Sequence, residues 1–268
     1  MSAIAILAVP FVTSAQESSG QPLWEIGAAG AAVSQLAYPG ASQHVNHGLA
    51  LPFLIYRGEY LRVDRSGAGI RAIKTSNFEL DVGVAGSFGS SSNDIEARRG
   101  MPDLGTFAEF GPRLTWHLGL GPGNGQLRAE FPLRGVFDLS DHLALKGVAF
   151  EPELVFVRRS QAGWNYRTGV GAVFGDKRLA DTFYGVASSY ATAGRPSYVA
   201  EGGLVAWRLS TSLFRKLSPD WRLFGFARLE TVGGAANQSS PLVQSKTGAS
   251  VGLGFTYTWM RSESQTTD

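Results

Sequence analysis

The stretch SKTGASVGLGFTYTW at residues 245–259 decides the fold. Read in steps of two, it places large apolar side chains on one face and glycine, serine and threonine on the other. Successive side chains of a β-strand point to opposite faces, so the stretch predicts a two-faced strand. A soluble sandwich would bury the large side chains and expose charges. Here one face of the strand is small and polar, and the other is apolar and ends in two aromatic residues. This pattern is typical of a membrane barrel strand whose large side chains contact lipid. That apolar face carries Val251, Leu253, Phe255, Tyr257 and Trp259.

The composition favours the same class. The chain has 268 residues, 34 glycines and 11% aromatic residues, and only 17% of its residues are charged, against about 25% in soluble domains. No run approaches the roughly 18 apolar residues that a spanning helix needs. The mean hydropathy of −0.02 suits a barrel, in which lipid-facing and lumen-facing residues alternate. The absence of cysteine excludes disulfides and thiolate metal sites.

The first fifteen residues predict a signal peptide. The apolar run AIAILAVPFV at residues 3–12 is followed by Thr13, Ser14 and Ala15, which are small residues of the kind that signal peptidase reads. No basic residue precedes the run, and a buried N-terminal strand is the alternative. Export indicates the periplasm or the outer membrane. The formal net charge of +2 gives no reason to expect a nucleic-acid partner.

Alternation recurs along the chain and predicts an all-β fold, a single antiparallel transmembrane β-barrel. A single-chain bacterial barrel has an even number of strands, so twelve is the prediction and ten the fallback. The barrel is expected over residues 16–259, with a polar tail at 260–268. The twelve strands are predicted at residues 24–33, 49–57, 60–74, 77–88, 106–118, 126–139, 142–159, 164–174, 183–186, 199–215, 221–231 and 245–259.

The lengths of the predicted connections indicate that the two ends of the barrel differ. Short turns at 57–58, 140–141 and 218–220 are expected on the periplasmic side, and longer loops on the outside. The longer loops are predicted at 35–46, 89–103, 175–181, 187–196 and 233–244. The segment 60–74 is expected to be one bent strand, and Pro152 is expected to interrupt another, since proline cannot donate to a sheet. The pairs Arg98–Arg99 and Arg158–Arg159 are expected near lipid headgroups.

Charged residues recur on the small-residue face. Residues 126–139 place Arg128, Glu130, Arg134 and Asp138 on one side, which would be costly in a dry core but suits a wet lumen. Arg228 and Glu230 share a face with Arg222, although Phe224 and Phe226 join them. The network either lines a polar channel or pairs across the barrel and fills it, and the interleaved signs favour filling. Its predicted members are Glu79, Asp81, Glu109, Arg113, His117, Arg128, Glu130, Arg134, Arg167, Arg208 and Arg222.

Several motifs resemble one family. The chain reads GMPDLGTFAEFGPRL at residues 100–114, YPG at 38–40 before LALPFLIYRG, FYGV at 183–186, RPSY at 195–198 and SPL at 240–242. This pattern is similar to that of the MipA/OmpV family of Gram-negative outer-membrane proteins. The resemblance implies an integral outer-membrane barrel in contact with outer-membrane lipid. For the family's namesake it implies a scaffold that brings a lytic murein transglycosylase together with a peptidoglycan synthase; other members are porin-like or adhesion-related. The motif residues are Tyr38, Pro39, Gly40, Gly100, Met101, Pro102, Asp103, Leu104, Gly105, Glu109, Gly111, Pro112, Ser240 and Pro241.

The segment at residues 100–105 has two interpretations. In a binding loop, Met101, Pro102 and Asp103 would contact a ligand. In a structural loop, Pro102 stiffens the chain, Asp103 caps a turn, and Gly100 and Gly105 adopt positive φ. The residue types favour the structural interpretation.

Catalytic, metal and cofactor sites are not predicted. The glycine-rich segment at residues 119–125 precedes a strand rather than the helix that a nucleotide loop requires. His44 and His47 have no nearby carboxylate to complete a metal site and are expected to be solvated in a loop. Without a G-x-S-x-G elbow, only His117, on the lumen face, is placed for acid–base work. The leading hypothesis is a non-enzymatic scaffold, the alternative is a small-solute channel, and an envelope hydrolase is third.

Overall fold

The computed structural model describes residues 22–57, 61–64, 67–160 and 163–264. The predicted signal peptide at 1–15, part of the predicted turn at 57–58 and the last four residues of the predicted tail lie outside these ranges. The described residues form one antiparallel sheet of thirteen strands. The strands are β1 Trp24–Leu36, β2 His44–Arg57, β3 Leu61–Asp64, β4 Gly67–Lys74, β5 Phe78–Ser87, β6 Phe107–Leu120, β7 Gln126–Asp138, β8 Ala144–Phe150, β9 Glu153–Arg158, β10 Asn165–Gly175, β11 Gly203–Lys216, β12 Trp221–Thr231 and β13 Thr247–Arg261.

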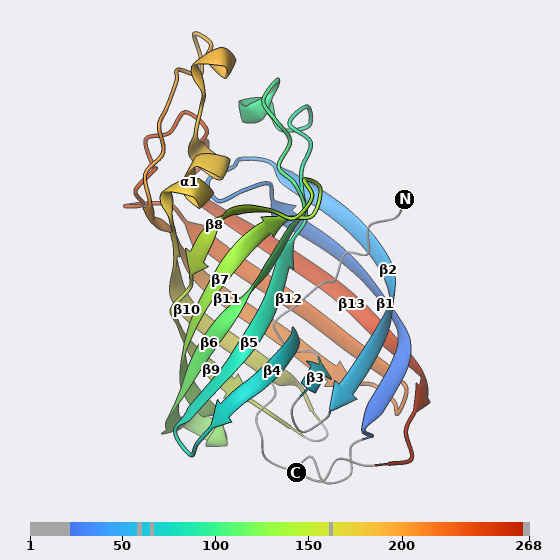
Figure 1. Ribbon diagram of the computed structural model, residues 1–268. Helices are drawn as coiled ribbons and strands as arrows, with labels where there is room; N and C mark the ends of the chain where they lie inside the picture. Colours follow the sequence, from blue (N-terminus) through green and yellow to red (C-terminus); the bar gives the residue numbers. More distant parts are fainter. Residues whose placement is uncertain (1–21, 58–60, 65–66, 161–162, 265–268) are drawn as a thin grey trace.

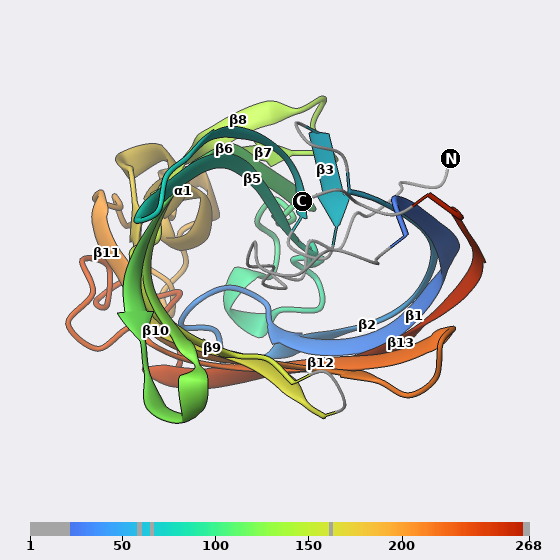
Figure 2. The ribbon, with the colours of Figure 1, turned by 90° about the horizontal axis from the view of Figure 1, so that it is seen from below.

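The sheet closes on itself, and the predicted antiparallel barrel is confirmed (Figures 1 and 2). The closing strand β13 pairs with β1, with Ala29 opposite Thr256 and Ala31 opposite Gly254, as predicted from the opening stretch. The strands β8 and β9 lie end to end between β7 and β10, and Pro152 occupies the break between them. The thirteen described strands therefore occupy twelve positions around the barrel.

Two of the predicted strands are wrong: one is absent and another is two strands. The two errors cancel in the number of strand positions, which stays at twelve. Residues 183–186 do not form a strand, because Tyr184 ends helix α1, Lys177–Tyr184. Asp176 starts this helix, since its carboxylate accepts a hydrogen bond from Leu179 N at 2.8 Å. Residues 60–74 are not one bent strand either, because β3 and β4 pair with each other as a hairpin.

Short helices accompany the connections. Within the described parts of the chain, these connections hold three single-turn 3₁₀-helices: η1 Glu96–Arg98, η2 Pro122–Asn124 and η3 Ser188–Tyr190. Since α1 and η3 both lie between β10 and β11, residues 176–202 form one long connection instead of two loops around a strand. No helix in the described ranges is long and apolar enough to cross a membrane.

The two ends of the barrel differ. The connections at 37–43, 88–106, 176–202 and 232–246 gather at one end, which we call the loop end (Figure 1). The turns at 75–77, 121–125 and 217–220 lie at the other end, which we call the turn end. The turn at 140–141 was expected among the short periplasmic turns. It lies at the loop end instead, because β7 runs toward that end.

The outer face of the barrel is apolar and aromatic. Leu253 and Phe255 are 61% and 48% exposed, and Trp207 is 51% exposed. Five of the six tryptophans lie near the turn end, at positions 24, 116, 164, 221 and 259. The Trp221 ring contacts the Tyr257 ring, with centroids 4.9 Å apart. Tryptophan and tyrosine concentrate at membrane–water interfaces, so these rings mark one edge of the lipid-facing band.

The lipid-facing assignment predicts a depth-dependent cost of charge. Leu253 lies near the middle of β13, and Leu120, 76% exposed, ends β6. Leu253→Arg should lower the free energy of unfolding in lipid vesicles by about 2 to 4 kcal/mol, whereas Leu120→Arg should lower it by about 1 kcal/mol or less. Guanidinium unfolding followed by tryptophan fluorescence measures both. Equal effects at the two positions would contradict the assignment.

Candidate functional site

Two phenylalanines line the inner wall where β12 pairs with β13. Phe224 and Phe226 on β12 lie opposite Gly254 and Gly252 on β13. A Cβ at Gly252 would lie 2.3 Å from the Phe226 ring, and one at Gly254 would lie 2.4 Å from the Phe224 ring. The glycines of the opening stretch thus leave room for two aromatic rings inside the barrel. This explains why both phenylalanines share a face with lumen charges.

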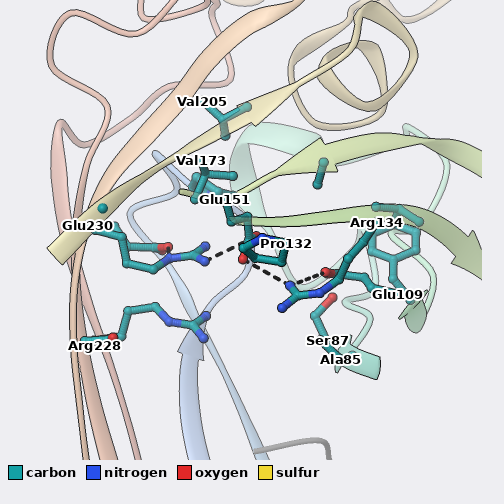
Figure 3. Close-up of a pocket in the computed structure, with 18 of the residues that line it drawn as sticks. Ala85, Ser87, Glu109, Pro132, Arg134, Glu151, Val173, Val205, Arg228 and Glu230 are labelled. Atoms are coloured by element: carbon teal, nitrogen blue, oxygen red, sulfur yellow. Dashed lines mark hydrogen bonds and ion pairs between the residues drawn. The ribbon is translucent and has the colours of Figure 1, made fainter. Parts of the chain in front are cut away.

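A row of alternating charges lines the inner wall near the loop end (Figure 3). Arg208 Nε donates to Glu230 at 2.7 Å, and Arg208 Nη1 lies 3.3 Å from Glu151. Arg134 Nη1 then donates to Glu151 at 3.1 Å and lies 3.5 Å from Glu109. We call these five residues the upper charge row. It links β12, β11, the break between β8 and β9, β7 and β6.

A second set of pairs lies deeper in the lumen. Arg167 lies 3.1 Å from Glu130 and 2.5 Å from Glu153. Arg113 contacts Asp81 through two hydrogen bonds of 3.0 and 2.6 Å. Removing one member of a buried pair leaves an uncompensated charge, which costs about 3 to 5 kcal/mol. The pairs therefore tie β10 to β7 and β9, and β6 to β5.

The four remaining predicted lumen residues, Glu79, His117, Arg128 and Arg222, lie toward the turn end. His117 Nε2 is 3.9 Å from Glu79, and Arg222 pairs with Glu25 and donates to Thr258 at 3.3 Å. Arg128 is only 4% exposed, and its Nε and Nη2 atoms have no hydrogen-bond partner among the described residues.

The structure thus places all eleven predicted lumen residues on the inner face, and it adds five that the predicted network missed. Alternation had already placed Arg228 and Glu230 on the face of Arg222, together with Phe224 and Phe226, but the predicted network did not include them. Glu151 and Glu153 flank Pro152, where regular alternation breaks. Glu25 stands alone in an alanine- and glycine-rich segment, so no local signal identified it. The missed residues are Glu25, Glu151, Glu153, Arg228 and Glu230.

The connections of the loop end pack into a folded unit that we call the loop cap, residues 37–43, 88–106, 176–202 and 232–246. Its apolar side chains come from all four connections and bury one another almost completely. Side chains buried in this way specify one arrangement rather than four independent loops. The buried core of the cap includes Tyr38, Ala41, Ile95, Met101, Leu104, Ala180, Tyr184, Val186, Ala200, Val232, Ala235 and Leu242.

Motif residues hold three of the connections together. Tyr38 Oη donates to Leu242 O at 2.7 Å, and Tyr184 Oη donates to Pro39 O at 3.0 Å. Ser240 Oγ donates to Tyr184 O at 2.8 Å. Gly40 has a φ of +90°, which favours glycine, and its carbonyl accepts hydrogen bonds from the backbone of residues 244 and 245. Most motif residues therefore meet in the cap, although they are far apart in the sequence.

The segment at residues 100–105 has the geometry of a structural loop. Met101 and Leu104 are buried in the cap, whereas Pro102 and Asp103 are exposed. The Asp103 carboxylate accepts a hydrogen bond from Ser92 N at 2.6 Å, which lowers the pKa of Asp103. Gly100 adopts a φ of +79° as expected. Gly105 was also expected to need positive φ, and this is wrong: a Cβ there would lie 1.9 Å from the Asp138 carboxylate.

The remaining motif residues lie on β6 rather than in the cap. Glu109 belongs to the upper charge row. Gly111 allows close approach of β7, since a Cβ there would lie 2.1 Å from Leu133 O. Pro112 is exposed on the outer face of the same strand.

Arg98 is a buried cation inside the cap and was wrongly expected near lipid headgroups. Its side chain is 4% exposed and donates to the carbonyls of Thr182, Phe183 and Pro102 at 3.4, 3.2 and 3.3 Å. Burial lowers the pKa of Arg98, and the neighbouring Tyr38 opposes that shift. The guanidinium joins the connections at 88–106 and 176–202 through backbone oxygens. No local sequence pattern predicts this arrangement.

The structure places His44 and His47 differently from the prediction. Both lie in β2 rather than in a loop. His44 Nε2 is 2.7 Å from Ala249 O, and the His47 ring lies 4.6 Å from the Phe88 ring. Among the described residues, no group of three histidines and carboxylates is placed to hold a metal ion.

A cavity of about 230 Å³ lies between the loop cap and the charged lumen (Figure 3). Helix α1 contributes Leu179 and Phe183 to its lining, and Phe107 and Val136 add apolar surface. The charged part of the lining includes the upper charge row and Arg228. The cavity is therefore apolar on the cap side and charged on the lumen side.

Comparisons with known proteins identify one matching family. The model of the family described as MltA-interacting protein MipA matches residues 26–259. Curated proteins gave no match. Among solved structures, an outer-membrane channel from Pseudomonas putida F1 is similar at 11% identity, covering 92% of this chain and 100% of that chain, with a TM-score of 0.39. A bacterial polysaccharide outer membrane secretin is similar at 10% identity, covering 90% and 99%, with a TM-score of 0.37.

Arg98 should stabilise the cap. Arg98→Met removes the donor for three carbonyls and should lower the free energy of unfolding by about 2 kcal/mol. It should also speed cleavage of the cap by added protease. Arg99→Met is the matched control, because the neighbouring Arg99 is exposed. Limited proteolysis of folded protein measures the difference, and equal cleavage rates in the two variants would contradict the role of Arg98.

Tyr38 should make the cap sensitive to high pH. Burial raises the pKa of Tyr38 from 10.0 to about 12, so the folded cap favours the neutral hydroxyl. The associated stability, roughly 2 to 3 kcal/mol, is fully present below pH 10 and is lost as pH rises through about 12. The tyrosinate absorbance of the parent minus that of Tyr38→Phe should rise with a midpoint near 12. A midpoint near 10 would contradict the assignment.

Proposed function

This chain belongs to the family described as MltA-interacting protein MipA, and on that premise we propose that it is a non-enzymatic outer-membrane scaffold of the cell envelope. The family match over residues 26–259 carries the proposal. Its proposed partners are a lytic transglycosylase, which the family's description names through MltA, and a peptidoglycan synthase. The apolar outer face and the tryptophans near one end support residence in the outer membrane.

The interior of the barrel favours a scaffold over an open channel. Salt bridges of the upper charge row run from β12 to β6, and the loop cap packs over the same end. A solute crossing the barrel would have to pass this charged wall and displace the cap. A small-solute channel remains the alternative, and it requires the cap to move.

The turn end is the proposed binding surface. Short turns of bacterial barrels normally lie in the periplasm, where murein enzymes act. The turn at 217–220 is braced by Arg261, which pairs with Asp220 and donates to Pro219 O at 3.3 Å. A braced turn presents a fixed shape to a partner at small entropic cost.

Site-specific crosslinking tests the scaffold. A photo-crosslinking residue at Pro219 or Gly123, in two turns of the turn end, should capture the transglycosylase or the synthase in intact envelopes. The same residue at Gly194 or Ser239, in the loop cap, should capture neither, because the cap faces away from the periplasm. Mass spectrometry identifies the products.

Recovery of no murein enzyme from either turn would contradict the scaffold role.

Planar-bilayer recordings of the purified protein distinguish the scaffold from the small-solute channel. Closed or rarely open traces agree with a scaffold, whereas stable open currents would favour the channel.

A further inference from the structure

We propose that the cavity beneath the loop cap is a binding site for a small organic monocarboxylate, held by Arg228. The ligand's carboxylate would contact the Arg228 guanidinium, and its apolar body would lie against the cap side of the cavity. This site is separate from the scaffold surface, because it lies at the loop end rather than at the turns.

Arg228 is the cation that the upper charge row leaves without a direct partner. Glu109, Glu151 and Glu230 each lie within 4.0 Å of Arg134 or Arg208. Arg228 lines the same cavity, yet no ion pair joins it to a described carboxylate, and its buried Nε atom has no hydrogen-bond partner among the described residues. Its guanidinium points into the cavity (Figure 3). An unsatisfied buried donor is costly, and a ligand acceptor would remove that cost.

The remaining walls select the rest of the ligand. Phe107, Leu179 and Phe183 give the cap side of the cavity an apolar surface with two aromatic rings. The Phe107 and Phe183 rings meet edge to face, with centroids 6.0 Å apart. A volume of about 230 Å³ exceeds the roughly 150 Å³ that suffices for benzene. A benzene ring with one carboxylate therefore matches the cavity in size and in polarity.

Carboxylate is favoured over a neutral acceptor because a guanidinium binds it through paired, charge-assisted hydrogen bonds. The charges near the cavity nevertheless constrain the ligand. Each carboxylate of the upper charge row already pairs with Arg134 or Arg208, so Arg228 is the guanidinium of this layer that is left to pair with a ligand. A second negative charge on the ligand would lack a free cation in this layer, which restricts the proposal to a single carboxylate.

The test uses benzoate and benzamide with the full chain in lipid nanodiscs, measured by isothermal titration calorimetry with empty nanodiscs as the blank. Benzoate should bind at one site and at least tenfold more tightly than benzamide. Arg228→Met should weaken benzoate binding by about tenfold or more. Arg215→Met is the matched control, since Arg215 is exposed on β11 and its guanidinium stacks on Trp164.

A cavity-filling variant keeps the test independent of charge. Gly83 on β5 lines the cavity, and a Cβ added there meets no atom within 4 Å, so Gly83→Leu should fill the site and abolish benzoate binding. Gly48→Leu is its control, because Gly48 is exposed on β2 with equally open space. Heat-dependent gel mobility confirms that each variant is folded.

Four results would each overturn the site: no benzoate binding to the parent chain, equal binding of benzamide, unchanged binding in Arg228→Met, or unchanged binding in Gly83→Leu. None of them bears on the scaffold, because crosslinking at Pro219 and Gly123 reports on the opposite end. Conversely, loss of those crosslinks would leave the carboxylate site standing.

Discussion

The structure depends on one constraint: a sheet in lipid must satisfy every backbone group through its neighbours. Closure of β13 onto β1 meets that constraint, and it turns the two-residue period of every strand into an outside and an inside. Large apolar side chains go outward, so charges on the same strands have only the lumen to occupy. Buried charges are costly unless they are paired, which explains why most of the lumen charges form ion pairs with charges on nearby strands.

Sequence reasoning succeeded where the period of two is unbroken. The strands β5, β6, β7 and β13 alternate cleanly, and their faces were predicted correctly. Reasoning failed where local propensity misled. The aromatic residues at 183–184 suggested a strand, but Asp176 caps a helix there. The segment 60–74 contains a hairpin, which alternation alone cannot distinguish from a bent strand.

The candidate site was only half predictable, for a physical reason. Lumen residues reveal themselves by charge on a regular strand, and that pattern identified Arg134 and Arg208. The cap has no period, since its contacts join four connections through tertiary packing and backbone carbonyls. Arg98 donates only to carbonyls, so no complementary carboxylate in the sequence could mark it as buried.

The positions of the family motif residues change what the motif means. Tyr38, Gly40, Met101, Leu104 and Ser240 are tied into the loop cap, at the end opposite the turns that would face murein enzymes. A motif that specified partner binding should instead gather at the turn end. The motif therefore specifies how the loop end is closed. In the proposed scaffold, partner choice rests on turn residues that the motif does not include.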